Sequence, residues 1–340
     1  MNPHCKMATG LLVASLPFAA SLRAQHPVTI PEMYTGSFAT SSNALPLGRT
    51  KAFIQYFIDG KHVGLRSPIV SQIGWRRAST TVTSPAATMQ LEIVLGATSA
   101  TFSTLSTTFA ANFTGTPTPF LALKALNFPA FSSATTDPDV PALWIRGDRP
   151  YIHTIGSSLI IQVDNQSSPT AGSLTGWNSD SILGGSTTSA IITSTDASCG
   201  GQLTTSYAAG SVSLSVSGAQ PNLPVVYLLG LHLAAPFDFG AIFGPTCTAV
   251  VLPDITIGVA ANAAGQHSFS FPLTTPVTET LVVHFQAIHL FNNQLVTTNA
   301  THMSIGNAGL CNYLYNWTTF GPTAQYGPYT TNRGPVHLIR

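Results

Sequence analysis

The chain consists of short apolar runs separated by Pro, Gly, Ser, Thr and Asp. Residues 89–95 (MQLEIVL) begin with alternating apolar and polar positions, which is the period of a strand with one buried face. No long segment keeps a 3.6-residue period with a cap at each end. Short strands with turn residues between them predict an all-β fold made of β-sandwiches. The strands expected in the first half are residues 53–58, 69–75, 89–95, 121–126, 143–145 and 159–163.

The most apolar run, residues 225–233 (VVYLLGLHL), lies between Pro224 and Pro236. It is too short to cross a bilayer, so we expect a central strand buried on both faces. Residues 98–112 are ambiguous and could hold one helical turn or a long excursion across the sandwich. Further strands of the second half are expected at residues 211–217, 248–252, 267–271 and 281–290, with one more near Met303.

Residues 1–24 have the features of a secretory signal peptide. A polar start containing Lys6 precedes an apolar region, residues 8–20, and small residues follow. We expect cleavage after Ala24, with cleavage after Ala20 as the alternative. No later stretch reaches the roughly 18 apolar residues of a membrane span. The sequence therefore predicts an exported protein, secreted or held at the cell surface.

The mature chain divides into two predicted sandwiches in tandem, jelly-roll or Ig-like, and a tail. Residues 25–194 form the first sandwich with its closing strands and a Ser/Thr/Gly-rich linker, and residues 195–306 form the second. The tail, residues 307–340, is aromatic, and its Gly-Pro pairs exclude a long helix. It could pack as an extended edge, add a strand to a neighbour, or offer aromatic rings to a sugar. The ligand-binding residues expected on the last interpretation are Tyr313, Tyr315, Trp317 and Tyr326.

Charged residues make up only 7% of the chain, against about 25% in an average soluble domain. Thr, Ser, Asn, Gln and Gly supply the polar surface instead, which is common outside cells. The formal net charge is +1, and no Lys or Arg lies between Arg149 and Arg333. Nucleic-acid binding needs a clustered basic face, and the sequence shows none.

Removal of the signal peptide leaves three cysteines, and export favours a disulfide between two of them. Three pairings are open. We expect Cys199–Cys247, which closes a loop of about fifty residues and contributes about 4 kcal/mol in the chain-entropy model. Cys311 is then left over, either buried and inert or linking two molecules. The cysteines have no CxxC spacing, which argues against a zinc site.

The sequence supplies few residues for catalysis. The three glutamates lie far apart, although a glycosidase needs two carboxylates beside the bond. Asp137 and Asp139, with Asp148, could hold calcium, but a solvated turn is the favoured interpretation. HExxH, G-x-S-x-G and phosphate-loop motifs are absent from the sequence. We therefore predict no catalytic residue, no metal and no cofactor.

Histidines and asparagines offer weaker candidates. His284 and His289 share one expected strand, but a spacing of five places them on opposite faces. His232 could neighbour His284 on an adjacent strand. N-x-Ser/Thr sequons, which matter only if the host glycosylates, occur at Asn112, Asn165, Asn299 and Asn316.

Several spaced Gly, Pro and apolar positions carry a family resemblance. They are Cys199-Gly-Gly, Ser217-Gly-Ala, Pro221, the run 225–230, Phe239-Gly, Cys247, and Gly265 before Phe269. Together they resemble a repeat in uncharacterised secreted two-domain β-sandwich proteins of planctomycete-type bacteria. The first half is similar to their companion domain at residues 69–77, 105–112, 159–165 and 177–180. The resemblance implies the fold and export, and it carries over no functional residue.

We therefore expect an exported all-β protein with a structural, adhesive or binding role at or outside the cell surface. The expected partners are polysaccharide or other cell-surface components, and further copies of the chain. One alternative is a secreted hydrolase whose site combines distant residues, such as His232, His284 and an aspartate. Another is a polymer-forming surface subunit in which residues 307–340 complete a neighbour's sheet and lie away from their own core.

Overall fold

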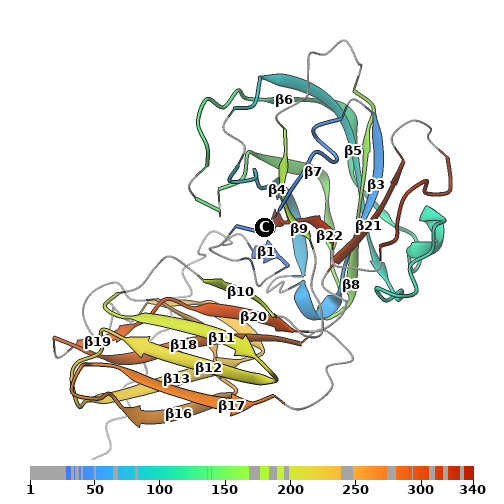
Figure 1. The fold of residues 1–340 in the computed structure, drawn as a ribbon. Helices are drawn as coiled ribbons and strands as arrows, with labels where there is room; N and C mark the ends of the chain where they lie inside the picture. Colours follow the sequence, from blue (N-terminus) through green and yellow to red (C-terminus); the bar gives the residue numbers. More distant parts are fainter. Residues whose placement is uncertain are drawn as a thin grey trace, which may run out of the picture.

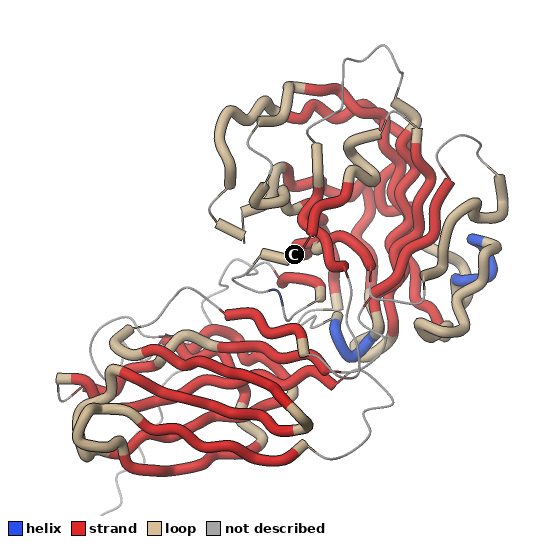
Figure 2. The backbone as a smooth tube through the Cα atoms, in the orientation of Figure 1, coloured by secondary structure: helices blue, strands red, loops and turns tan. Residues whose placement is uncertain are grey.

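The computed structural model describes residues 28–340 apart from twelve short gaps and five single positions. The residues outside the description are 1–27, 32–33, 35–37, 40, 50, 64–67, 81–82, 136, 139, 168–176, 184–189, 195–198, 239–247, 274–280, 293, 306–310, 317–320 and 330–332. The described part is almost entirely antiparallel β-sheet with short helical turns (Figure 2), which confirms the all-β prediction. Within it, no helix is long and apolar enough to cross a membrane.

The sheets form two groups, visible as two bodies in Figure 1. The first group has a five-stranded sheet, a four-stranded sheet and a three-stranded sheet around one hydrophobic core. In spatial order, the first sheet is β21 (Cys311–Asn316), β3 (Ala52–Ile58), β8 (Ser158–Asn165), β5 (Ala87–Thr98) and β6 (Thr118–Phe128). The second is β1 (Val28–Ile30), β23 (His337–Ile339), β4 (Ile69–Trp75) and β7 (Leu143–Ile152), and the third is β2 (Ser41–Asn43), β9 (Ser179–Leu183) and β22 (Arg333–Pro335).

The second group is a sandwich with its own core. Its central sheet runs β10 (Ile191–Ser194), β20 (Thr301–Ile305), β18 (Leu281–Phe291), β13 (Pro224–Gly230) and β16 (Ile255–Ala260), with β19 (Gln294–Thr297) on β18. The facing sheet is β11 (Gln202–Ala208), β12 (Ser211–Ser217) and β17 (His267–Pro272), and a hairpin adds β14 (His232–Asp238) and β15 (Thr248–Leu252). β12 shows why the sheets pack: its valines and leucine are buried, and its serines alternate with them on the other face. Whether the groups fold independently, as predicted for two domains, stays a prediction.

The central strand predicted at residues 225–233 is present but shorter. β13 lies between β16 and β18, and its Val225 and Tyr227 are fully buried. The strand ends at Gly230, where an added Cβ would lie 2.0 Å from the carbonyl oxygen of Leu252. Only glycine permits this close approach of the Leu252 carbonyl oxygen to the strand. The chain turns at Leu231, and His232 is the first residue of β14. The ambiguous stretch before residue 112 holds one helical turn, η3 (Phe109–Asn112).

The predicted tail is a structural part of the first group. β21 pairs with β3, β22 pairs with β9, and β23 lies between β1 and β4. These strands are the red segments in the upper body of Figure 1. Residues 336–339 are fully buried. Three of the four are apolar, and their strand β23 lies inside the sheet between β1 and β4. The polymer alternative required a tail lying away from its own core, and the described tail strands lie in that core.

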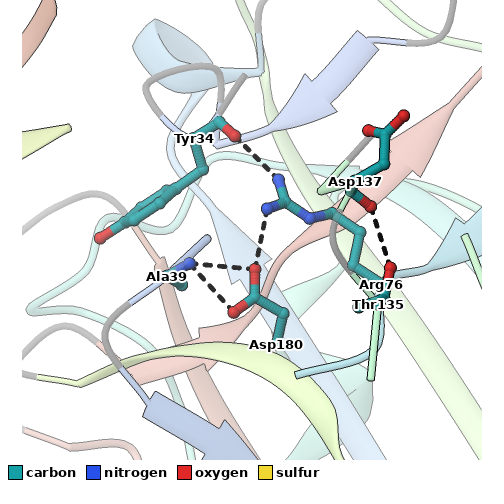
Figure 3. Close-up of polar contacts among 6 residues, drawn as sticks. All are labelled: Tyr34, Ala39, Arg76, Thr135, Asp137 and Asp180. Atoms are coloured by element: carbon teal, nitrogen blue, oxygen red, sulfur yellow. Dashed lines mark hydrogen bonds and ion pairs between the residues drawn. The ribbon is translucent and has the colours of Figure 1, made fainter. Parts of the chain in front are cut away.

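A buried ion pair joins distant segments of the first group (Figure 3). Arg76 Nη2 lies 3.0 Å from Asp180 Oδ2, and both side chains are 1% exposed. Arg76 Nη1 also donates to the Tyr34 carbonyl oxygen at 2.8 Å, and the Ala39 amide donates to the Asp180 carboxylate at 3.0 Å. The Val336 amide donates to the Asp180 carbonyl oxygen at 2.8 Å. Residues near both ends of the described chain therefore meet at one ion pair.

All four sequon asparagines are buried, and their side chains hold loops in place. Asn165 Nδ2 donates to the carbonyl oxygens of Pro46 and Arg49 at 2.9 and 2.8 Å. Asn299 binds both main-chain groups of Leu203, accepting at 2.8 Å and donating at 3.0 Å. A glycan on such an amide would remove these bonds and has no room in the folded protein. The sequons, including those at Asn112 and Asn316, are therefore structural positions.

Asp180→Asn tests the ion pair, because it leaves the Arg76 charge buried without its counter-charge. We expect the free energy of unfolding to fall by about 3–5 kcal/mol, measured by urea titration at pH 7. Asp148→Asn is the matched control, since Asp148 pairs with Lys124 on the surface, where both side chains are 42% exposed. That control should change stability little. Equal effects of the two substitutions would contradict the role given to Arg76 and Asp180.

Candidate functional site

Among the described aromatic residues proposed for sugar binding, only Tyr326 is exposed. Tyr313 and Tyr315 are 8% and 9% exposed, and Tyr313 belongs to the first core. Tyr326 is 41% exposed, but one of its faces stacks on Tyr315 with ring centroids 4.9 Å apart. Trp317 lies outside the described residues. A sugar needs an uncovered aromatic face, so the burial of Tyr313 and Tyr315 removes them as stacking surfaces.

The cysteines are separated between the two groups. Cys247 lies outside the described residues, so the Cys199–Cys247 disulfide stays a prediction. Cys199 is half-buried, and its amide donates to the Thr297 carbonyl oxygen at 3.1 Å. Cys311 is a thiol in the first core, only 2% exposed, and burial raises its pKa well above the usual range. Such a thiol is unreactive, which favours the buried and inert alternative for Cys311.

Of the three aspartates considered for calcium, Asp148 has other partners for its carboxylate. The Asp148 carboxylate accepts from Lys124 Nζ and from the Ala122 amide. The Asp137 main-chain oxygen accepts from Thr135 Oγ1 at 3.1 Å (Figure 3), and Asp139 lies outside the described residues. Among the residues that the structure describes, no three His, Cys, Asp or Glu side chains are placed to hold a metal ion.

Four histidines gather where η2 (Gly60–His62) of the first group approaches the second group. His284 on β18 lies opposite His302 on β20, with their Nδ1 atoms 2.8 Å apart. Burial is the main reason that the pKa of His284 lies well below its usual range. Electrostatic repulsion from His302, His232 and His62 lowers it further. Burial also lowers the pKa of His62 to about 3 and that of His302 to about 4.

His232 lies close enough to His284 to influence its pKa, although its strand β14 pairs with β15 and not with β18. The described titratable groups that shift the pKa of His284 are all histidines, without a carboxylate among them. The His284–His302 contact at 2.8 Å requires one neutral ring to donate and the other to accept. A His–Asp arrangement of the kind expected for a hydrolase is therefore not assembled around His284.

An apolar cavity of about 180 Å³ opens at one end of the second core. The facing sheet contributes one wall, which includes Val212 of β12 and Phe271 of β17. The central sheet contributes the other wall, which includes Leu229, Phe285 and Met303. The surface that these side chains present is apolar. The remaining lining residues are Gly230, Leu231, Asp254, Ile255, Leu273, Leu281 and Val283.

The mouth of this cavity is also apolar and faces solvent. Leu231 is 49% exposed and Ile255 is 58% exposed. Asp254 holds the turn that carries Leu231: its Oδ2 accepts from the Leu231 amide at 2.8 Å, and its amide donates to the Leu229 carbonyl oxygen at 2.9 Å. Exposed apolar side chains that continue into an apolar cavity are characteristic of binding sites.

Sequence reasoning missed this cavity, although one signal was present. Residues 255–259 alternate as Ile-Thr-Ile-Gly-Val directly after Pro253-Asp254, which is the pattern of a strand following a turn. That strand is β16, and its first residue forms part of the mouth. The cavity itself depends on the separation of two sheets, which no local pattern encodes.

No family model matches the chain, and no curated protein matches it either.

Because several histidines are buried, we expect acid to destabilise the fold. His62, His284, His302 and His337 are neutral in the folded protein because burial lowers their pKa values, to about 3 for His337. In the unfolded chain they bind protons below about pH 6.5, so each costs about 2 kcal/mol of stability by pH 5.

The expected result is a urea midpoint that falls continuously from pH 6.5 to pH 4 and recovers on return to pH 7. His302→Gln should make this pH dependence shallower, because one protonation is then removed from the unfolded chain. A midpoint that stays constant between pH 7 and pH 5 would contradict the assignment of neutral buried histidines.

Proposed function

We propose that this protein is exported and acts as a binding protein at or outside the cell surface, holding an apolar group in the cavity of the second group. One observation carries the proposal: the exposed side chains of Leu231 and Ile255 lead directly into an apolar cavity of about 180 Å³. Export is supported by the signal-like residues 1–24 and by the weakly charged composition.

The size of the cavity sets the scale of the ligand. Apolar cavities of about 150 Å³ lined by aliphatic and aromatic side chains stay dry and bind benzene-sized molecules. A cavity of about 180 Å³ accordingly accepts a group of about six to eight carbon atoms. Burial contributes about 0.8 kcal/mol per methylene, so a six-carbon chain gains about 5 kcal/mol, which corresponds to a Kd on the order of 0.1–1 mM.

The other roles considered from sequence receive less support. His284 and His302 are 1% and 0% exposed, so a substrate does not reach them in the folded protein. The sugar platform loses Tyr313 and Tyr315 to burial. A binding role at the cavity uses side chains that are already accessible.

Occupation of the cavity can be followed at Met303, whose side chain lines it. With methionine methyl groups labelled with ¹³C, 1-hexanol should shift the Met303 signal and leave the signal of Met89, in the first core, unchanged. Val283→Phe places a larger ring in the cavity and should weaken hexanol binding at least tenfold. Leu231→Gln, at the exposed mouth, should weaken it to a smaller extent without risk to the fold.

Leu252→Gln is the matched control, because Leu252 is equally exposed but does not line the cavity. It should bind hexanol like the unchanged protein. A Met303 signal that does not respond to hexanol, or equal affinity in all three variants, would overturn the proposed site.

A further inference from the structure

The cavity has one charged lining residue, Asp254, and this residue stands at its mouth. Its Oδ2 accepts from the Leu231 amide, and its own amide donates to the Leu229 carbonyl oxygen. Its Oδ1 has no hydrogen-bond partner among the described residues, and the residue is exposed. The turn therefore holds the carboxylate through Oδ2, and Oδ1 remains available as an acceptor.

The second group contains no lysine or arginine that could pair with this negative charge. No Lys or Arg occurs between Arg149 and Arg333, and every strand of the second group lies within that interval. The Asp254 carboxylate is exposed beside apolar side chains, with no lysine or arginine of its own group to neutralise it. An incoming ligand can supply the missing positive charge.

We propose that the cavity selects small organic ammonium ions, with the apolar body in the cavity and the ammonium group at Asp254. This inference rests on the proposed function, because it assigns a ligand class to the same site. A cationic N–H donor and a carboxylate form a charge-assisted hydrogen bond, which is stronger than a neutral one. A carboxylate ligand would be repelled at the same position, and a neutral alcohol would gain only the burial of its chain.

The geometry of Asp254 favours an ammonium ligand but limits how strong the preference over an alcohol can be. Because the two turn hydrogen bonds already hold Asp254, its side chain loses little freedom when the ligand binds. Because the carboxylate is exposed, water and salt weaken its attraction for a cation. The expected preference for an ammonium over an alcohol of equal chain length is about two- to fivefold at low salt.

Three ligands with the same six-carbon chain test the inference on the full-length protein. Hexylammonium, 1-hexanol and hexanoate are titrated at pH 7.5 and low salt, with the Met303 methyl signal giving each Kd. We expect hexylammonium to bind tightest and hexanoate weakest, and 0.5 M NaCl to reduce the difference between them.

Asp254→Asn should abolish the ammonium preference, so that hexylammonium and 1-hexanol bind with equal affinity, while an asparagine oxygen can still accept from the Leu231 amide. Glu92→Gln is the matched control: it removes the same charge from β5 of the first group and should retain the preference. Equal affinity for the three ligands would overturn the inference while leaving the apolar site intact. A preference that persists in Asp254→Asn would also overturn it. If none of the ligands shifts Met303, the proposed function itself fails.

Discussion

The buried pair of Arg76 and Asp180 is the constraint on which the first group depends. Only 7% of the residues are charged, and two of those charges lie 3.0 Å apart in the interior. An isolated buried charge is strongly unfavourable, so the pair must form completely. Its side chains also bond the Tyr34 carbonyl oxygen and the Ala39 amide near the start of the described chain. The main chain of Asp180 accepts from the Val336 amide near the other end, so segments from both ends of the chain lie beside the pair.

This arrangement is consistent with the path of the chain through the second group and back to the C-terminal strands. The chain leaves the first group after β9, builds the second group, and returns at β21 to pair with β3. The second group meets the first through Val282, which belongs to the first core, and through the histidine cluster around His284. The apolar cavity lies beside this contact, because Leu281, Val283 and Phe285 of the same strand, β18, line it. Its mouth is exposed, and Asp254 is the one charged side chain among the described residues that line it.

Local pattern predicted the strands well because burial follows local apolar periodicity. Residues 53–58, 211–217 and 281–290 needed no knowledge of their partners. The role of the tail was not predictable in this way, since the pairing of β21 with β3 joins residues about 250 positions apart, and sequence gives no sign of that register. The break at Gly230 depends on the close approach of Leu252, and the burial of the sequon asparagines depends on loops that they hold. The cavity arises from the spacing of two sheets, so the sequence predicted the strands around it and not the site.

Hydrogen exchange of the full-length protein, read by mass spectrometry, tests most directly whether the C-terminal strands belong to the first group. Amides in the cooperative core of a protein open only with global unfolding, whereas those of a frayed terminus exchange almost freely. We expect the amides of β21 and β23 to exchange as slowly as those of β3 and β4, their partners. Rapid exchange in β21 and β23 beside slow exchange in β3 and β4 would contradict the account.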